Sequence, residues 1–289
     1  MVHKLEKFSQ RSLLSKACGM ISRVILGQIE EEDAILLLNK VPFSEEKMDV
    51  YENEVYQEND IYTNGVIEVK EKVKYMLIHP ATPFHIKKYT HSTKVMIKES
   101  AETYKTKTLP QALALGPSCH WVDNIMTACE NDPLTQNTSH GEQILHNDPE
   151  FVVIPDSKWD RTSLDTLYLL VLFKDPLVYT VRELRDTHIP MLTRIQASVA
   201  EVLRLYSTDI AETKLYFHYY PTFFRAHIHV SSLKMSWPGE LLGASLLLHD
   251  VIANLELSTT YYQDRTLEIP LSHASYLYNI FSDAPGKDC

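Results

Sequence analysis

The sequence contains few cysteines, and none of them forms a recognisable pair. Cys18, Cys119, Cys129 and Cys289 are scattered along the chain, and no Cys-x-x-Cys occurs. Structural zinc sites and disulfide frameworks both need closely or regularly spaced cysteines. We therefore expect neither, and we expect a reduced, intracellular protein that holds no metal.

Positive charge and long apolar runs are scarce as well. Lysine and arginine number 28 against 38 acidic residues, which gives a net charge of −10. Long nucleic acids need clustered positive charge, so we expect no such partner, although a few cations in a pocket can still hold a small anion. No stretch approaches the roughly eighteen apolar residues of a membrane span, and the N-terminus has no signal-peptide core. We expect a soluble protein without a membrane partner, located in the cytoplasm, with a nuclear share left open.

The composition nevertheless supports a well-packed protein of more than one part. Of the 289 residues, 44% are hydrophobic and 10% aromatic, which is enough for a sizeable core. The length fits two domains, or one domain with a large extension. We predict an α+β fold in three parts: a smaller N-terminal α+β domain over residues 1–89, a connecting helix or hinge over 90–108, and a larger domain over 109–289.

The pattern within the N-terminal part changes after about residue 40. Residues 24–26 and 34–38 are apolar clusters separated by the acidic run 30–33, and we predict helices there. The dipeptide Asn64-Gly65 lies between alternating segments, which is a strong hairpin signal because the turn needs positive φ at both positions. Residues 74–78 predict a further strand.

Apolar runs in the larger domain predict four strands, at 151–155, 167–173, 214–220 and 225–231. Met191, Ile195, Val199 and Val202 have the spacing of a helical stripe, so we predict a helix over 187–205 with Pro190 in its first turn. A last helix is expected over 240–257, and a short helical or extended piece over 121–126. The polar segment 130–150 predicts an exposed loop.

The most informative stretch is a strand that carries histidines. Alternate side chains of a strand point to opposite faces, so Arg225, His227 and His229 should share one face, and His218 could join them from the neighbouring strand. The residues between them should pack inward: Ala226, Ile228 and Val230. Such a face could bind a metal, could carry out phosphate chemistry, or could have no special role. The nearest carboxylate downstream, Glu240, does not decide between these readings.

This stretch resembles the histidine-triad family, and in particular its scavenger mRNA-decapping branch. That branch carries a His-Tyr-x-Pro-Ser-Tyr-Tyr run before its triad, and the matching run here is His218-Tyr219-Tyr220-Pro221-Thr222-Phe223-Phe224. The segments 109–110, 120–122, 154–160, 164–169, 182–186 and 261–267 resemble the same branch. The similarity covers most of residues 75–270, whereas the first sixty residues show little of it.

The resemblance implies both a fold and an activity. The fold is the antiparallel sheet of a histidine-triad domain with helices, in a domain-swapped homodimer whose N-terminal domain covers the partner's site. The activity is hydrolysis of short 7-methylguanosine-capped RNA, or of the cap dinucleotide, to 7-methyl-GMP and a nucleoside diphosphate. His227 matches the catalytic nucleophile, and no cofactor is implied. Neutral imidazole suits this role, because its lone pair can attack phosphorus and form a phosphohistidine.

The resemblance also implies two sets of binding residues. The phosphate-binding set is His218, Thr222, Arg225, His229, Lys88 and Lys158. Lys88 ends the N-terminal domain, which would let that domain act as a lid. The cap-base set is Trp121, Glu130, Asp156 and Ser157. Because 7-methylguanine is cationic, an aromatic face with nearby carboxylates recognises it.

The chain departs from the branch at five positions. Arg225 stands where the first triad histidine is usual, Phe223 replaces a tyrosine, and Ser157 replaces a bulky apolar residue. Glu130 lies one residue before the expected carboxylate. An arginine early in the last helix is missing, and Lys234 could compensate; a lost charge-assisted hydrogen bond of about 1.5–3 kcal/mol predicts a ten- to hundredfold slower reaction. The alternative function is therefore a weak or inactive cap-binding regulator that pairs with an active relative.

Overall fold

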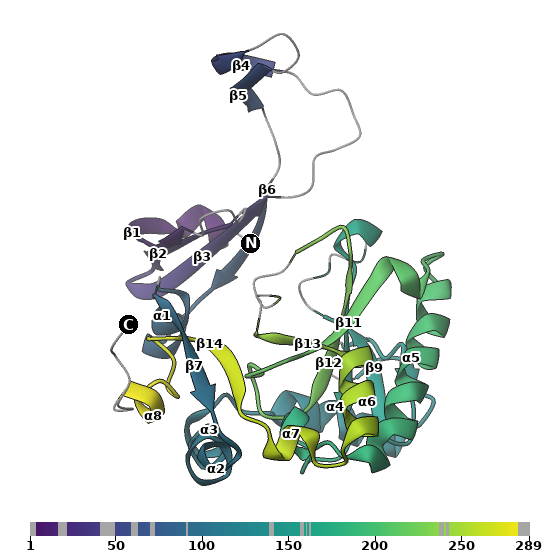
Figure 1. Ribbon diagram of the computed structural model, residues 1–289. Helices are drawn as coiled ribbons and strands as arrows, with labels where there is room; N and C mark the ends of the chain where they lie inside the picture. The colour runs from purple at the N-terminus through teal and green to yellow at the C-terminus, as the bar shows by residue number, and fades with distance from the viewer. Residues whose placement is uncertain are drawn as a thin grey trace. The chain divides into compact units, whose positions relative to one another are not determined.

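The computed structural model describes residues 4–16, 22–40, 50–58, 63–69, 73–90, 92–138, 142–156, 159, 161, 163–236, 240 and 243–282. The chain divides into two compact units, Met1–Thr93 and Lys94–Cys289. Figure 1 labels many of the helices and strands of both units. Each unit contains its own antiparallel sheet and its own buried core.

The N-terminal unit is built on a four-stranded sheet with the order β1-β2-β3-β6. Its elements are η1 (Lys4–Lys7), β1 (Ser9–Lys16), β2 (Ser22–Ile29), β3 (Glu32–Lys40), β4 (Val50–Glu58), β5 (Thr63–Val69), β6 (Val73–Ile78) and α1 (Pro83–Tyr89). Strands β4 and β5 form a separate two-stranded ribbon. The core is small: Val24, Ile35 and Ala81 are buried, and Ile86 and Tyr89 of α1 pack against them.

Two predictions for this unit are wrong. The apolar clusters 24–26 and 34–38 lie in strands β2 and β3 rather than in helices, because short apolar runs do not distinguish the two by periodicity. The hairpin of β4 and β5 is present, but Asn64 and Gly65 pair with Gln57 and Val55 inside its ladder. The connection therefore falls between residues 58 and 63, outside the described residues. The strand expected at 74–78 is confirmed as β6.

The larger unit contains a six-stranded antiparallel sheet with the order β13-β11-β12-β10-β9-β8. Its strands are β8 (His146–Asn147), β9 (Phe151–Pro155), β10 (Tyr168–Phe173), β11 (Thr213–His218), β12 (His227–Ser232) and β13 (Ser245–Leu247). The four predicted strands are confirmed, each to within two residues at either end. Strands β9, β10 and β12 are buried along their whole length, which indicates that both faces of the sheet centre are covered.

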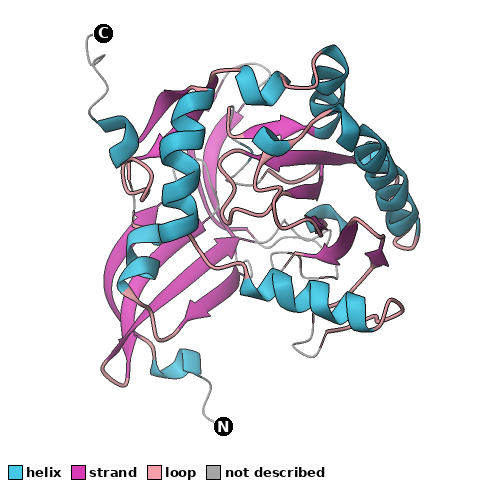
Figure 2. Cartoon of the chain, turned by 90° about the horizontal axis from the view of Figure 1, so that it is seen from below, coloured by secondary structure: helices cyan, strands magenta, loops and turns pink. Residues whose placement is uncertain are grey.

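Helices cover the two faces of this sheet. Helices α5 (Ile189–Arg204) and α6 (Leu248–Leu257) lie side by side in Figure 1 and share a core with Val153, Val171 and Ile228. Helix α4 (His120–Asn131) packs on the opposite face, against Val152 and Leu172. Figure 2 views the chain from below, with the helices in cyan and the strands in magenta. The helix expected at 187–205 is confirmed, whereas the last helix begins only at Leu248 because β13 precedes it.

The remaining helical segments are short. They are α2 (Ala101–Thr103), the π-helical turn η2 (Tyr104–Thr108), α3 (Leu109–Leu115), η3 (Leu164–Thr166), η4 (Val181–Glu183), η5 (Asp186–His188), η6 (Ile210–Glu212), α7 (Tyr261–Asp264) and α8 (Asn279–Ser282). The predicted loop 130–150 is only partly irregular, because α4 continues to Asn131 and His146–Asn147 pairs with β9 as β8.

The connecting helix expected over 90–108 begins later than predicted. Lys94–Glu99 forms strand β7, which pairs with β14 (Leu267–Ser272), and helical turns start at Ala101. Met96 and Lys98 are exposed while Ile97 and Glu99 are buried, which is the two-residue period of a strand. Glu99 forms a buried ion pair with Arg182 and accepts a hydrogen bond from Tyr220, so β7 is tied to the loop that precedes β12.

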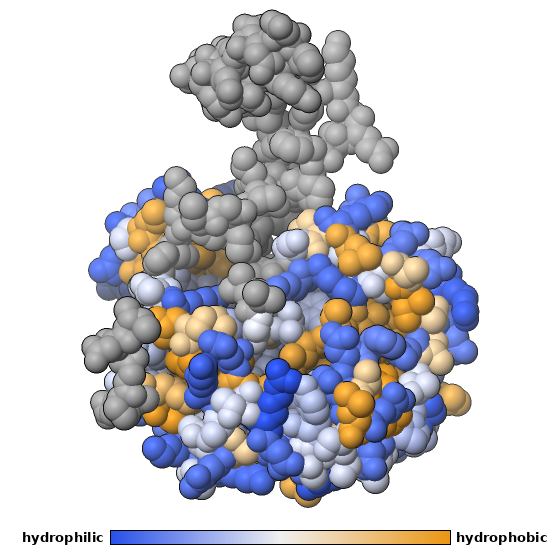
Figure 3. All heavy atoms as spheres, in the orientation of Figure 1, coloured by the Kyte–Doolittle hydropathy of each residue, from blue (hydrophilic) through white to orange (hydrophobic). Residues whose placement is uncertain are grey.

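The surface of the molecule mixes residue types. On the face drawn in Figure 3, orange hydrophobic and blue hydrophilic residues are interspersed. Exposed large apolar side chains come from separate elements, among them Leu115 of α3, Leu205 after α5 and Leu257 of α6. Scattered apolar residues of this kind are usual on proteins and indicate no particular partner. None of the described helices is both long and apolar enough to span a bilayer.

Candidate functional site

Three histidines meet on the face of the larger sheet that α4 covers. His227 and His229 lie on β12, and His218 ends the neighbouring strand β11. The ring centroid of His229 is 4.0 Å from that of His218 and 4.8 Å from that of His227. Ile228 and Val230 are fully buried on the opposite face. The prediction that His227 and His229 share a strand face, with His218 beside them, is confirmed.

His227 is held by a backbone group and an aromatic ring. Its Nδ1 lies 2.7 Å from the carbonyl oxygen of Arg225. A carbonyl can only accept, so Nδ1 carries the proton and the lone pair of the neutral ring is on Nε2. The phenyl ring of Phe223 stacks on the imidazole at 4.2 Å with an interplanar angle of 13°. Both contacts restrict the ring of His227 to one orientation and one tautomer.

Arg225 does not lie on the strand with the histidines. Strand β12 begins at His227, and the buried guanidinium of Arg225 donates to the Asp123 carboxylate at 2.5 Å and to the Lys174 carbonyl at 2.9 Å. Strand β12 therefore begins two residues later than predicted, but the guanidinium of Arg225 binds α4, the helix that covers the sheet face of His227 and His229. Arg225 supports His227 through its backbone carbonyl and links that segment to α4.

His229 is held by side chains instead. Its Nδ1 lies 3.0 Å from the hydroxyl of Tyr168, whose oxygen is 3.3 Å from the hydroxyl of Tyr216. Tyr216 donates to Glu240 at 3.1 Å. Burial raises the pKa of both phenols above their ordinary value of 10, so both hydroxyls keep their protons at neutral pH. Neither tyrosine was predicted from the sequence; Tyr216 lies two residues before His218, and this strand period was the signal that could have found it.

Trp121 and Asp156 come from two elements near this sheet face. Trp121 is half-buried in the first turn of α4, and its ring meets Phe223 edge-on at 5.2 Å. Phe223 thus lies between Trp121 and His227. Asp156 is buried directly after β9, and its backbone amide donates to the Tyr168 carbonyl. Thr222 is exposed in the connection between β11 and β12.

Glu130 is not brought next to Trp121. Both residues belong to α4, and Glu130 lies nine residues further on, in the last turn. Nine residues correspond to about 13.5 Å along a helix and to half a turn around its axis. Glu130 is exposed on the side away from Trp121. Glu130, at the start of the predicted loop 130–150, belongs to the end of a regular helix.

The structure gives no position relative to this sheet face for three further predicted residues. Ser157 and Lys158 lie outside the described residues. Lys88 belongs to α1 of the N-terminal unit. Among the residues that the structure describes, no group of three or more histidine, cysteine, aspartate or glutamate side chains could hold a metal ion.

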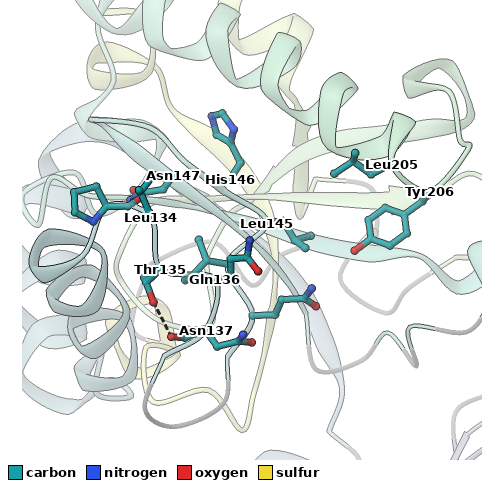
Figure 4. A pocket seen from close by; sticks show the side chains of 12 residues that line it. Leu134, Thr135, Gln136, Asn137, Leu145, His146, Asn147, Leu205 and Tyr206 are labelled. Carbon is teal, nitrogen blue, oxygen red and sulfur yellow. Dashed lines mark hydrogen bonds between the residues drawn. The ribbon is translucent and has the colours of Figure 1, made fainter.

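Two cavities elsewhere contain none of the predicted site residues that the structure describes. The larger, of about 410 Å³, lies beside β8 and the end of α5 (Figure 4). Leu134, Asn137, His146 and Tyr206 are among its lining residues, and its described lining includes no lysine or arginine. A second cavity, of about 230 Å³, is lined in part by Lys105 and Arg182. Phosphate chemistry needs a nucleophile and donors together, so we place the site at the histidines.

Neighbouring antiparallel strands that present clustered imidazoles, one with its Nδ1 on a backbone carbonyl, match the pattern of a histidine-triad hydrolase. The model for "Scavenger mRNA decapping enzyme (DcpS) N-terminal" matches residues 3–92, and that for "Scavenger mRNA decapping enzyme C-term binding" matches residues 128–242. The chain therefore belongs to the scavenger mRNA decapping enzyme family.

Curated relatives span nearly the whole chain. A Caenorhabditis elegans protein named m7GpppX diphosphatase is 31% identical over 275 residues, which cover 90% of this chain and 86% of the relative. Proteins of the same name from Homo sapiens and Schizosaccharomyces pombe are 29% and 28% identical and cover 97% and 96% of this chain. Those alignments cover 85% and 95% of the respective relatives.

Proposed function

We propose that this chain hydrolyses short 7-methylguanosine-capped RNA fragments, or the cap dinucleotide, to 7-methyl-GMP and an (oligo)nucleoside diphosphate. The observation that carries the proposal is the 2.7 Å contact between His227 Nδ1 and the Arg225 carbonyl, which puts the lone pair of His227 on Nε2. Membership of the decapping family supports the same assignment.

In the proposed reaction, Nε2 of His227 attacks the phosphorus attached to the methylated guanosine. A nitrogen–phosphorus bond forms as the bond from phosphorus to the bridging oxygen breaks, and the electron pair leaves with the nucleoside diphosphate. Water then attacks the phosphohistidine, releases 7-methyl-GMP and restores the imidazole. The ring centroids of His218 and His229 are 4.0 Å apart, and both imidazoles donate to phosphate oxygens as charge develops.

The proposal keeps separate residues for the base and for the phosphates. Trp121 would stack on the cationic base, and Asp156 would supply a carboxylate beside it. Thr222, Lys88 and Lys158 remain proposed phosphate donors, and Ser157 a proposed base contact. Arg225 is assigned to the support of His227, because its guanidinium binds Asp123 and the Lys174 carbonyl.

The assembly and location are part of the same proposal. A domain-swapped homodimer would bring the N-terminal unit, with Lys88, over the partner's histidines. Light scattering tests this, since a monomeric mass together with full activity would contradict it. We also propose a cytoplasmic location with a nuclear share, which fractionation of cells expressing the tagged chain would test.

The first experiment incubates the purified chain with a methylated cap dinucleotide and with its unmethylated counterpart, with His227→Asn in parallel. Chromatography should show 7-methyl-GMP from the wild type with the methylated compound alone. A second function, that of a cap-binding regulator, is favoured by Phe223, which has no hydroxyl and stacks on an imidazole that is only 3% exposed. Raised melting temperature with the methylated dinucleotide, but no product, would select that function.

A further inference from the structure

The carboxylate of Glu240 lies at the far end of the hydrogen bonds that lead from His229. Tyr216 and Ser231 donate to its Oε1 at 3.1 and 3.0 Å, and Lys214 donates to its Oε2 at 2.6 Å. The Glu240 side chain is 12% exposed. Both carboxylate oxygens therefore have partners from β11 and β12, the two strands that carry the histidines.

The ion pair with Lys214 determines the hydrogen-bonding role of the Glu240 carboxylate. The ammonium of Lys214 also donates to the Met235 carbonyl at 2.8 Å, which holds it beside Glu240. A carboxylate that is paired with an ammonium is ionised and can only accept hydrogen bonds. Glu240 is thus a fixed acceptor from which the direction of the other bonds can be worked out.

The direction of each hydrogen bond follows from that acceptor. Tyr216 gives its proton to Glu240, so its oxygen can only accept from Tyr168. Tyr168 then uses its proton on Tyr216, and its oxygen can only accept from Nδ1 of His229. The proton of His229 that faces this chain is therefore on Nδ1. The remaining nitrogen is Nε2, and it can donate to a phosphate oxygen only when the ring is charged.

We propose that Glu240 is a positioning residue for His229: acting through Tyr216 and Tyr168, it keeps a proton on Nδ1 and favours the charged imidazolium, which can donate from Nε2 to the substrate's phosphate. This inference rests on the proposed function for its purpose, but not for its geometry. It gives the chain a means of supplying positive charge at the histidines without a further arginine. The 3.3 Å link between the two phenols is the longest, so the effect on His229 should be graded rather than absolute.

Several charged or titratable groups face His229, and the test must separate them from Glu240. His218 and Tyr216 approach from β11, Tyr168 from β10, and His227 from its own strand. The neighbouring imidazoles oppose a charge on His229, whereas the carboxylate favours it. Glu240→Gln is the cleanest change, because the amide oxygen can still accept from Tyr216 and Ser231 while the negative charge is lost.

The experiment is an NMR titration of 15N-histidine-labelled full chain, with His229 assigned by His229→Gln. We expect Glu240→Gln to lower the pKa of His229 by about 0.5–1 unit. Tyr216→Phe should also lower the pKa of His229. The double variant should lower it little further, because both changes interrupt the same series of hydrogen bonds from His229 to Glu240. Asp165→Asn is the matched control. It removes the ion pair with Lys234, which lies in the segment between β12 and β13 that also contains Glu240, and it should leave the pKa of His229 unchanged.

A purely structural role for Glu240 gives a different result. It would lower the melting temperature of Glu240→Gln and leave the titration of His229 where it is in the wild type, and that outcome overturns the proposal. An equal shift in Asp165→Asn would overturn it as well. Because the titration needs no substrate, it tests the role of Glu240 even if no cap hydrolysis is found. If hydrolysis is found, the alkaline limb of its pH profile should move to lower pH in Glu240→Gln alone.

Discussion

His227 and His229 lie two residues apart on one face of β12, and both are at least 95% buried, yet different kinds of groups hold them. The Nδ1 of His227 meets a backbone carbonyl, and a phenyl ring covers one side of its imidazole. The Nδ1 of His229 meets a phenol, which is joined through a second phenol to a carboxylate. One surrounding is apolar and fixed by the main chain, and the other is polar and built from side chains.

The difference matches the two roles proposed for these rings. A nucleophile must keep one tautomer with its lone pair toward phosphorus, and a carbonyl that cannot change its hydrogen-bonding role enforces this. A phosphate donor gains from positive charge, and a distant carboxylate can favour that charge without binding the ring itself. The two histidines should therefore respond differently to substitution.

The largest expected effect comes from exchanging the two imidazoles for amides. His227→Asn removes the nucleophile, so turnover should fall by at least about 10³-fold. His229→Gln removes one donor that strengthens in the transition state, and kcat should fall by about ten- to a hundredfold. Single-turnover measurements on the methylated dinucleotide, with melting curves to confirm folding, provide the comparison. Equal losses in both variants would contradict the separate roles.

A smaller effect on kcat is expected when the residue that anchors Arg225, the backbone support of His227, is changed. The carbonyl of Arg225 belongs to the main chain, but the guanidinium of the same residue is anchored by Asp123. Asp123→Asn weakens a charge-assisted hydrogen bond, and a loss of about 1.5 kcal/mol would lower kcat about tenfold. Urea unfolding should show a drop in stability of similar size or less, because the Asp123 side chain is 52% exposed.

The matched control for this variant is Asp148→Asn in the same unit. Asp148 pairs with Arg194 at 3.3 Å, and its neutral form can still accept from the Glu150 amide. That ion pair has no contact with the histidines among the described interactions, so kcat should not change. A tenfold loss in the control would show that general surface charge, and not the support of His227, sets the rate.

A still smaller effect on kcat is expected at Phe223, because its ring contacts the imidazole of His227 without forming a hydrogen bond to it. Phe223→Leu keeps an apolar side chain but removes the stacked ring at 4.2 Å. A ring pair contributes about 0.5–1 kcal/mol beyond burial, so kcat should fall about two- to fivefold. Phe223→Tyr retains the stack and adds a hydroxyl, and its kcat should equal or exceed that of the wild type. A lower kcat in Phe223→Tyr would mean that the added hydroxyl does not assist the reaction.

Local pattern predicted the central part of this fold. The alternation from Ala226 to Val230 located β12 and its two faces, and the helical stripe from Met191 to Val202 located α5. The apolar clusters of β2 and β3 were assigned to helices because a run of three to five apolar residues fits both periods. Strand β7 was missed because its partner, β14, follows about 170 residues later in the chain.

The site was predictable only where its residues lie on one strand or on the strand that neighbours it in the chain. His218, His227 and His229 follow from strand spacing, and a strand–loop connection brings them together. The contact of Arg225 with Asp123 spans 102 residues, and that of His229 with Tyr168 spans 61. Such pairs depend on how α4 and β10 pack against β12, which no local period encodes. Glu240 was therefore visible in the sequence as a carboxylate, but not as a partner of Tyr216.

The smallest effect on the comparison appears only in alkaline solution. Ionisable phenols support His229, whereas the support of His227 includes none among its described contacts. Burial raises the pKa of Tyr168 and Tyr216 in the folded chain above the unfolded value of about 10. Their contribution to stability is present in full below pH 10 and is lost as the pH rises from 10 toward the folded pKa. Each buried phenol should make the free energy of unfolding fall by about 1.4 kcal/mol per pH unit above 10.

Tyr168→Phe should therefore unfold with a shallower pH dependence than the wild type, even if it is less stable at neutral pH. Urea midpoints at several values between pH 10 and 11 give the slope, and midpoints between pH 8 and 9 give the reference. Phe223→Leu is the control from the side of His227, and its slope above pH 10 should match that of the wild type. Equal slopes in all three proteins would mean that Tyr168 ionises freely in the folded state. The hydrogen bonds from His229 toward Glu240 would then be interrupted at their first link.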